Sequence, residues 1–153
     1  CEHLGLWPVA HETLEQQVVE LVNERRAQGA NCGREGSFSP TGSLTMDPVL
    51  QCAARLHSVD MAERNYMDHV NPDGESPFDR ITAAGYTGGT PQGENIAAGY
   101  PTAEAVVNGW MASDGHCSNI MEPGYTEIGV GYFHNPNSEF HTYWTQKFGA
   151  RRR

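Results

Sequence analysis

The sequence of 153 residues contains no apolar run approaching the roughly 18 residues that a membrane-spanning helix needs. Internal repeats and low-complexity tracts are also absent, and the length fits one domain. Basic residues are few, since 10 Lys and Arg stand against 19 Asp and Glu for a formal net charge of −9, and Lys147 is the single lysine. Phosphate backbones would repel such a chain, so we expect no nucleic-acid partner.

The paired C-x-x-C spacing of a zinc module is absent as well. We therefore interpret the four cysteines, Cys1, Cys32, Cys52 and Cys117, as disulfides, which favours an extracellular, cell-surface or periplasmic location. Three pairings are open, and we favour Cys32–Cys117 with Cys1–Cys52. The alternative is four buried thiols in a cytosolic protein.

The first residue is Cys1, and neither an initiator Met nor an apolar signal segment precedes it. We interpret this start as the product of signal removal or of trimming. Bacterial lipoproteins are acylated on a leading cysteine, so a lipid anchor at Cys1 is a second interpretation. An acylated Cys1 would leave an odd number of thiols, because it could not also form a disulfide.

Apolar spacing and capping residues predict four helices, which run from Thr13 to near Gly29, from Asp47-Pro48 to about Tyr66, from Ser76 or Pro77 to Gly85, and from Thr102 to about Met111. Two strand-like runs follow, Glu127–Phe133 and Thr142–Phe148. This order predicts an α+β domain in which helices cover a small sheet. We expect an N-terminal extension at 1–12, the domain at 13–150 and a solvated basic tail at 151–153.

Three residues stand where turns or glycines leave room for a ligand: His69 begins a tight turn, Glu94 leaves a Gly-rich loop, and His116 lies between a helix and an apolar run. Two imidazoles and a carboxylate are enough to bind a borderline divalent ion while leaving coordination positions open. The same residues could transfer protons, because histidine titrates near neutrality. The alternative is that both histidines bond to backbone carbonyls and that Glu94 is an exposed acid.

Six short motifs in order along the chain carry a family resemblance. The run Gly93-Glu94-Asn95-Ile96-Ala97 resembles the GENIA element of the CAP superfamily, which includes cysteine-rich secretory proteins, venom antigens and plant pathogenesis-related proteins. The other motifs are 57–62, 66–74, 110–121, 127–132 and 143–149. Together they span about residues 14–149, and the chain is similar to the bacterial SCP-like type of the superfamily.

The resemblance implies a three-layer α-β-α sandwich around a small antiparallel central sheet. It also implies a central cleft lined by two histidines and two acidic residues, in which several members bind a divalent metal. His69, His116 and Glu94 match three of these positions, which implies Zn²⁺ or Mg²⁺ as the cofactor. Ser113 stands where animal and plant members have the second acid, and Glu127 or Asp114 are the candidate substitutes.

Neighbouring residues have simpler interpretations. His57 lies on the apolar stripe of its helix and is expected to be a core histidine bonded to backbone. Asn95 and Asn119 are expected to tie loops together and so to hold Glu94 and His116. Trp110 and Trp144 are interpreted as core packing. Ser113 and Ser118 lie near His116, but neither a strained nucleophile turn nor a buried orienting Asp is visible.

Three functions remain, because one fold hosts many roles. The first is an extracellular ligand-binding module whose His- and Glu-lined cleft takes a lipid, sterol, glycan or peptide. A lipid would need an apolar groove, for which Tyr66, Met67, Tyr86, Ile96 and Tyr100 are the candidates. The second is a metal-assisted hydrolase in which Glu94 is the base. The third is a structural or interaction protein with an idle cavity. We expect a monomer.

Overall fold

The structure, a computed structural model, describes residue 1 and residues 4–151. Five α-helices are present in this part of the chain: α1 Val9–Gln28, α2 Pro48–Arg64, α3 Pro77–Ala83, α4 Ala103–Met111 and α5 Asp114–Met121. A short 3-10 helix, η2, covers Gly33–Glu35. None of the described helices is long and apolar enough to cross a membrane.

Capping side chains set the starts of the helices around the candidate site. The Asp47 carboxylate accepts hydrogen bonds from the Val49 and Leu50 amides, and Pro48 occupies the first turn of α2. Ser76 and Asp79 form a reciprocal capping box at the start of α3. These local signals are readable in the sequence, which is why the predictions for α2, α3 and α4 agree with the structure.

The central sheet has four strands in the order β3-β5-β6-β4. Strands β5 (Glu127–His134), β6 (Thr142–Ala150) and β4 (Gly89–Ala98) are antiparallel neighbours, and β3 (Thr45–Met46) pairs with β5 in parallel. Strands β1 (Ala30–Asn31) and β2 (Ser37–Phe38) form a separate two-stranded sheet. The central sheet is therefore antiparallel apart from the two-residue strand at one edge.

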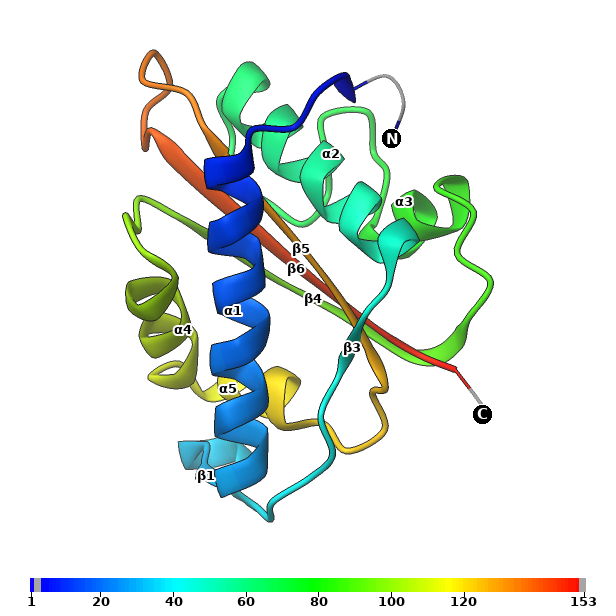
Figure 1. Cartoon of the computed structure of the whole chain (residues 1–153), viewed down its shortest axis with the longest axis vertical. Helices are drawn as coiled ribbons and strands as arrows, with labels where there is room; N and C mark the ends of the chain where they lie inside the picture. The colour runs from blue at the N-terminus through cyan, green and yellow to red at the C-terminus, as the bar shows by residue number, and fades with distance from the viewer. Residues whose placement is uncertain (2–3, 152–153) are drawn as a thin grey trace.

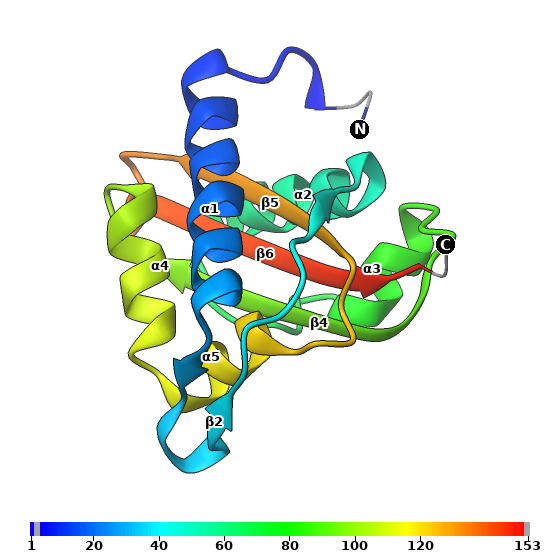
Figure 2. The same ribbon diagram turned by 60° about the horizontal axis from the view of Figure 1, so that its bottom comes forward.

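Helices cover both faces of this sheet (Figures 1 and 2). Helices α1, α4 and α5 lie on one face, and α2 and α3 lie on the other, so the predicted three-layer α-β-α sandwich is confirmed. Trp110 and Trp144 are 2% and 0% exposed in the core between α1, α4 and the sheet, as predicted for packing residues.

The alternation of side chains along β4 sends Glu94 toward α3 and Asn95 toward α5.

Both disulfides connect the pairs that the sequence favoured, Cys1–Cys52 and Cys32–Cys117. The Cys32–Cys117 bond is buried and ties the 30–46 segment to α5. The Cys1–Cys52 bond fixes the first residue to α2. Because the Cys1 sulfur lies in this bond, it cannot carry a thioether-linked lipid while the bond is intact.

The structure differs from the sequence-based expectations near both ends of the chain. Helix α1 begins at Val9 rather than at Thr13, whose hydroxyl donates to the Val9 carbonyl inside the helix. The predicted boundary between 1–12 and 13–150 therefore falls within α1. Arg151 was expected in a solvated tail, but it forms ion pairs with Glu127 and Asp47. Residues 2–3 and 152–153 lie outside the described residues.

Besides the short elements β1, η2, β2 and β3, two longer elements were missed. Residues 88–93 were interpreted as a Gly-rich loop, yet β4 begins at Gly89 and pairs with β6 along most of its length. The segment that carries His116 was not predicted as a helix, but it forms α5. Both errors concern the elements that position the candidate site.

Candidate functional site

Glu94 is the centre of the candidate site. It lies on β4 directly opposite Lys147 of β6, so both side chains point toward the face covered by α2 and α3. The Glu94 side chain is only 2% exposed. The alternative interpretation of Glu94 as an exposed acid is therefore excluded. The charge of this carboxylate has to be balanced inside the protein.

Two cations provide that balance. The Lys147 ammonium, 1% exposed, forms an ion pair with Glu94 Oε2. Arg80 of α3 donates from Nη2 to Glu94 Oε2 at 3.1 Å and to Oε1 at 3.3 Å. A buried pair is stable only when further hydrogen bonds satisfy the remaining polar atoms, and this carboxylate accepts from three residues.

The pKa values follow from these contacts. Burial alone would raise the pKa of Glu94, but the His69 hydrogen bond and the Lys147 charge outweigh it and lower the pKa to about 2. Burial lowers the pKa of Lys147 to about 8, with the Glu94 charge opposing this shift. At neutral pH, Glu94 is therefore ionised and Lys147 is mainly protonated.

His69 takes its orientation from Glu94. Its Nδ1 lies 2.8 Å from Glu94 Oε1, and its side chain is 46% exposed. An ionised carboxylate can only accept, so Nδ1 is the donor in this pair. In the neutral ring, Nε2 then carries a lone pair that can accept a hydrogen bond. A fixed carboxylate that holds an imidazole in one tautomer is an arrangement used both by metal sites and by general bases.

His116 approaches the same place from α5. Its Nδ1 lies 2.9 Å from Ser113 Oγ, and burial, together with the charge of His69, lowers its pKa. His69 contacts Glu94 directly, whereas His116 is linked to β4 through the hydrogen bond that Asn95 donates to its carbonyl. We call His69, Glu94 and His116 the His–Glu cluster, and Ser113 lies beside it.

Hydrogen bonds from two asparagines hold the cluster, as the sequence predicted. Asn95 donates to the His116 carbonyl at 3.3 Å, and Asn119 donates to the Glu94 carbonyl at 3.1 Å. A Cβ at Gly93 would collide with Tyr125 Oη and Asn119 Oδ1, so a glycine is needed there for α5 to approach β4. His57 is a core residue, 1% exposed, whose Nε2 lies 2.9 Å from the Asp68 carbonyl.

The two candidate substitutes for the second acid lie elsewhere. Glu127 is on β5, with β6 between it and β4, and it accepts hydrogen bonds from Tyr86 and Arg151. Asp114, on α5, pairs with Arg34 at 3.4 Å. Neither contact reaches Glu94. The fourth position beside the cluster is therefore occupied by Ser113, which bonds to His116.

The donor set does not fit a three-ligand metal centre. Within residues 1 and 4–151, no group of three or more His, Cys, Asp or Glu side chains is placed to hold a metal ion. Both Glu94 oxygens already face cations, and Mg²⁺ would need oxygen ligands that the cluster does not offer. Zn²⁺ or Mg²⁺ binding stays a prediction.

Sequence reasoning missed Arg80 and Lys147. The single lysine was noticed, but only the β4–β6 register places it beside Glu94. Arg80 was one charge on a short predicted helix, and its contact requires α3 to pack against β4. The signal available in the sequence was the predicted strand 142–148, in which the alternation of side chains places Lys147 on an inward-facing position.

Ionised Glu94 makes the protein sensitive to acid. Its folded pKa of about 2 lies below the ordinary value of 4.5, so its stabilisation is complete above pH 4.5 and is lost as the pH falls toward 2. We expect the free energy of unfolding to fall more steeply between pH 5 and pH 3 in the native protein than in the Glu94→Gln variant. Urea unfolding at several pH values measures both slopes, and equal slopes would contradict this origin.

The fold and the site together define a class of protein: a three-layer α-β-α domain with one imidazole bound to a buried carboxylate of the edge strand β4 and a second imidazole on the neighbouring helix α5. The family model described as the cysteine-rich secretory protein family, CAP, matches residues 19–148. The chain belongs to this family, as the sequence motifs predicted.

Similar proteins are found in bacteria. The Bacillus subtilis (strain 168) protein YkwD is 42% identical over 142 residues, which cover 92% of this chain and 49% of YkwD. An extracellular SCP-domain protein of Bacillus anthracis superposes with a TM-score of 0.77 at 26% identity, covering 96% of this chain and 45% of that one. An outer surface protein of Borrelia burgdorferi has a TM-score of 0.70 at 19% identity and 92% coverage of both chains.

The Bacillus subtilis relatives are longer than this chain, so the function of the whole relatives is not assigned to it. The chain spans about half the length of YkwD and 37% of the Bacillus subtilis membrane protein YlbC, to which it is 32% identical over 145 residues. The similarity to the Borrelia protein, at 19% identity, supports the fold alone. These two solved proteins are named as an extracellular protein and an outer surface protein. The two disulfides of this chain are typical of an oxidising compartment.

Proposed function

We propose that this domain is an extracellular ligand-binding module in which His69 and His116 contact the ligand. The observation that carries the proposal is the His69–Glu94 hydrogen bond of 2.8 Å, in which a half-exposed imidazole is held by a buried carboxylate. Glu94 is itself fixed by Arg80 and Lys147. The His69 side chain, held by Glu94, is therefore oriented before the ligand arrives, which lowers the entropic cost of binding.

The ligand that suits this anchor is polar at the point of contact. A hydroxyl or amide N–H can donate to His69 Nε2, which favours a glycan or a peptide. The residues expected to form an apolar groove for a lipid do not gather in one place. Ile96 is buried in a core cluster with Tyr66 at its margin, whereas Tyr86 and Tyr100 belong to two other clusters.

Substitution of His69 tests this proposal. We suggest measuring the binding of chitotriose, a Gly-Ser tetrapeptide, cholesterol and palmitate to the native domain and to His69→Ala. We expect chitotriose or the tetrapeptide to bind, and the affinity to fall about tenfold in His69→Ala because one oriented hydrogen bond is lost.

The matched control is His134→Ala, which removes an exposed imidazole at the end of β5. It is expected to leave the affinity unchanged. The proposal is wrong if none of the four probes binds, or if a bound probe keeps its affinity when His69 is replaced.

A hydrolase is the second candidate, and the same His69–Glu94 pair favours it. His69 Nε2 could take a proton from water while Glu94 holds the ring in one tautomer. The predicted role of Glu94 as the base is less suited to its surroundings, because a carboxylate with a pKa of about 2 is a weak base. In this scheme Glu94 positions the imidazole.

A further inference from the structure

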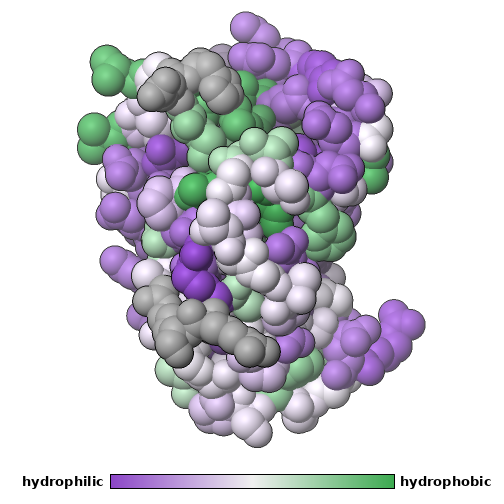
Figure 3. All heavy atoms as spheres, turned by 90° about the vertical axis from the view of Figure 1, so that its right-hand side faces the viewer, coloured by the Kyte–Doolittle hydropathy of each residue, from purple (hydrophilic) through white to green (hydrophobic). Residues whose placement is uncertain are grey.

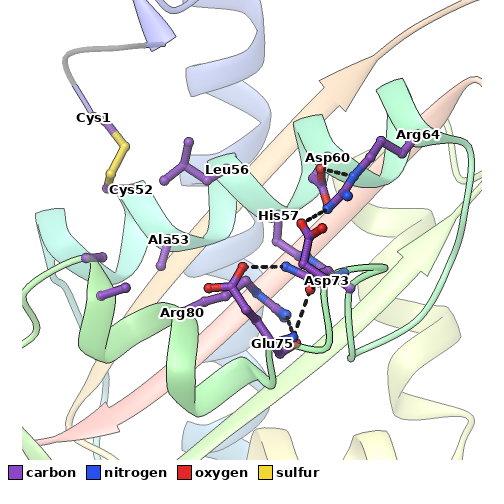
Figure 4. Close-up of a pocket in the computed structure, with 13 residues that line it drawn as sticks. Cys1, Cys52, Ala53, Leu56, His57, Asp60, Arg64, Asp73, Glu75 and Arg80 are labelled. Atoms are coloured by element: carbon purple, nitrogen blue, oxygen red, sulfur yellow. Dashed lines mark hydrogen bonds and ion pairs between the residues drawn. A yellow bond between two sulfur atoms is a disulfide. The ribbon is translucent and has the colours of Figure 1, made fainter.

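A separate pocket lies between α2 and α3 (Figure 4), with a volume of about 470 Å³. One wall is a stripe of α2 from Cys52 to Arg64, and the other is formed by α3 and the 71–75 segment. Neither His69 nor His116 lines it. The volume falls within the range of about 300–1,000 Å³ that is typical of small-molecule sites.

One end of the pocket is apolar. The Cys1–Cys52 disulfide, Leu56 and Ala83 line this end, and none of them offers a charged or strongly polar side chain. The surface seen from the side of Figure 3 mixes hydrophilic and hydrophobic residues without one broad apolar patch. Apolar contact in the pocket is therefore local and suits a short aliphatic segment rather than a membrane or a wide protein surface.

The other end is charged, and most of its charges are already paired. Arg64 forms ion pairs with Asp60 at 2.7 Å and with Asp73 at 2.9 Å. Arg80 uses Nη1 on the Glu75 carbonyl and Nη2 on Glu94. The Nη atoms of both guanidinium groups therefore already face oxygen acceptors, and Arg80 Nε, which has no partner among the described residues, is buried and out of reach of a ligand.

Glu75 is the exception. Its Oε1 accepts one hydrogen bond, from Asn71 at 2.9 Å, and no cation pairs with its carboxylate among the described residues. The residue is exposed on the pocket wall. Within residues 1 and 4–151, no hydrogen bond reaches its second oxygen, so this oxygen can accept from a ligand.

We propose that this pocket is a second binding site, which takes an alkylammonium group. The ammonium donates to Glu75, and the aliphatic chain lies along Leu56 and the Cys1–Cys52 disulfide. A charge-assisted hydrogen bond beside apolar contact is a combination that neither an anion nor a neutral hydrocarbon can use. A lysine side chain of a polypeptide and a free diamine both provide this chemistry.

The test follows the backbone amide resonances of the ¹⁵N-labelled domain as pentylamine is added at pH 7. We expect saturable shifts at Leu56, Glu75 and Ala83. Glu75→Gln keeps an oxygen that can accept from Asn71 but removes the charge, so the affinity is expected to fall about tenfold. Pentanoate, which has a similar chain and the opposite charge, is expected to cause no saturable shift.

The matched control is Glu24→Gln, the same change at an exposed position of α1 on the opposite face of the sheet. It is expected to bind pentylamine as the native domain does. His69→Ala should also bind normally, which separates failure at this pocket from failure of the proposed function. Saturable binding of pentanoate, unchanged affinity in Glu75→Gln, or no shifts with pentylamine would each overturn the proposal.

Two further probes distinguish the source of the amine. Nα-acetyl-lysine methylamide carries the lysine side chain with a peptide backbone, and cadaverine is a free diamine of the same length. Tighter binding of the lysine derivative assigns the site to a polypeptide, and tighter binding of cadaverine assigns it to a small diamine. Both results support the alkylammonium class.

Discussion

Replacing Lys147 with Met is expected to lower the free energy of unfolding by about 3 kcal/mol. Removing one member of a buried ion pair typically costs about 3–5 kcal/mol, because the other charge is left without compensation. Here Glu94 keeps Arg80 and His69 as partners, so we expect the lower end of that range. Urea unfolding at pH 7 measures the difference from the native protein.

The double variant Lys147→Met/Glu94→Gln serves as the control. If the uncompensated carboxylate causes the loss, neutralising it should restore part of the stability, and the double variant should unfold at a higher urea concentration than Lys147→Met alone. A loss below about 1 kcal/mol in Lys147→Met, as is usual for exposed pairs, would show that water reaches Glu94 and screens its charge.

Replacing both Cys32 and Cys117 with Ala is expected to cost about 4 kcal/mol, since the bond closes a long loop and typical losses are about 2–5 kcal/mol. The two residues are separated by 85 positions, and both are buried. Cys117 is next to His116, so we also expect the His116 resonance to broaden or shift. Thermal unfolding and NMR measure the two effects.

The Cys1→Ser/Cys52→Ser variant is the comparison for this experiment. It removes the other disulfide, which joins an exposed first residue to α2 and is distant in sequence from His116. We expect its His116 resonance to stay unchanged. If both double variants alter His116 alike, the effect arises from general loosening of the fold and not from the anchoring of α5.

Helices α2 and α3 were predictable because their signals are local. Asp47-Pro48 and Ser76-Pro77 combine a capping side chain with a proline in the first turn, and the structure uses both. Strand β4 was missed because Gly89, Pro91 and Gly93 are residues that usually interrupt strands, whereas here the pairing with β6 holds them in the sheet. The pairing partner β6, which is distant in the sequence, therefore decided that this segment forms a strand.

The candidate site shows the same division. The closeness of His69, Glu94 and His116 came from the family resemblance, since their positions in the sequence do not fix a geometry. Lys147 balances the charge of Glu94 because the β4–β6 register places the two residues opposite each other. Arg80 balances it because α3 packs against β4. Glu75 depends on a pocket that only the packing of α2 against α3 creates.

The hydrogen bonds along β4 also affect whether the sheet edges of two molecules can pair at high concentration. β4 is one edge of the central sheet, and its Glu94 and Ile96 carbonyls accept from the side chains of Asn119 and Trp110. The opposite edge, β3, has only two residues. A second molecule therefore finds few free backbone groups for strand pairing, so the sheet resists edge-to-edge aggregation.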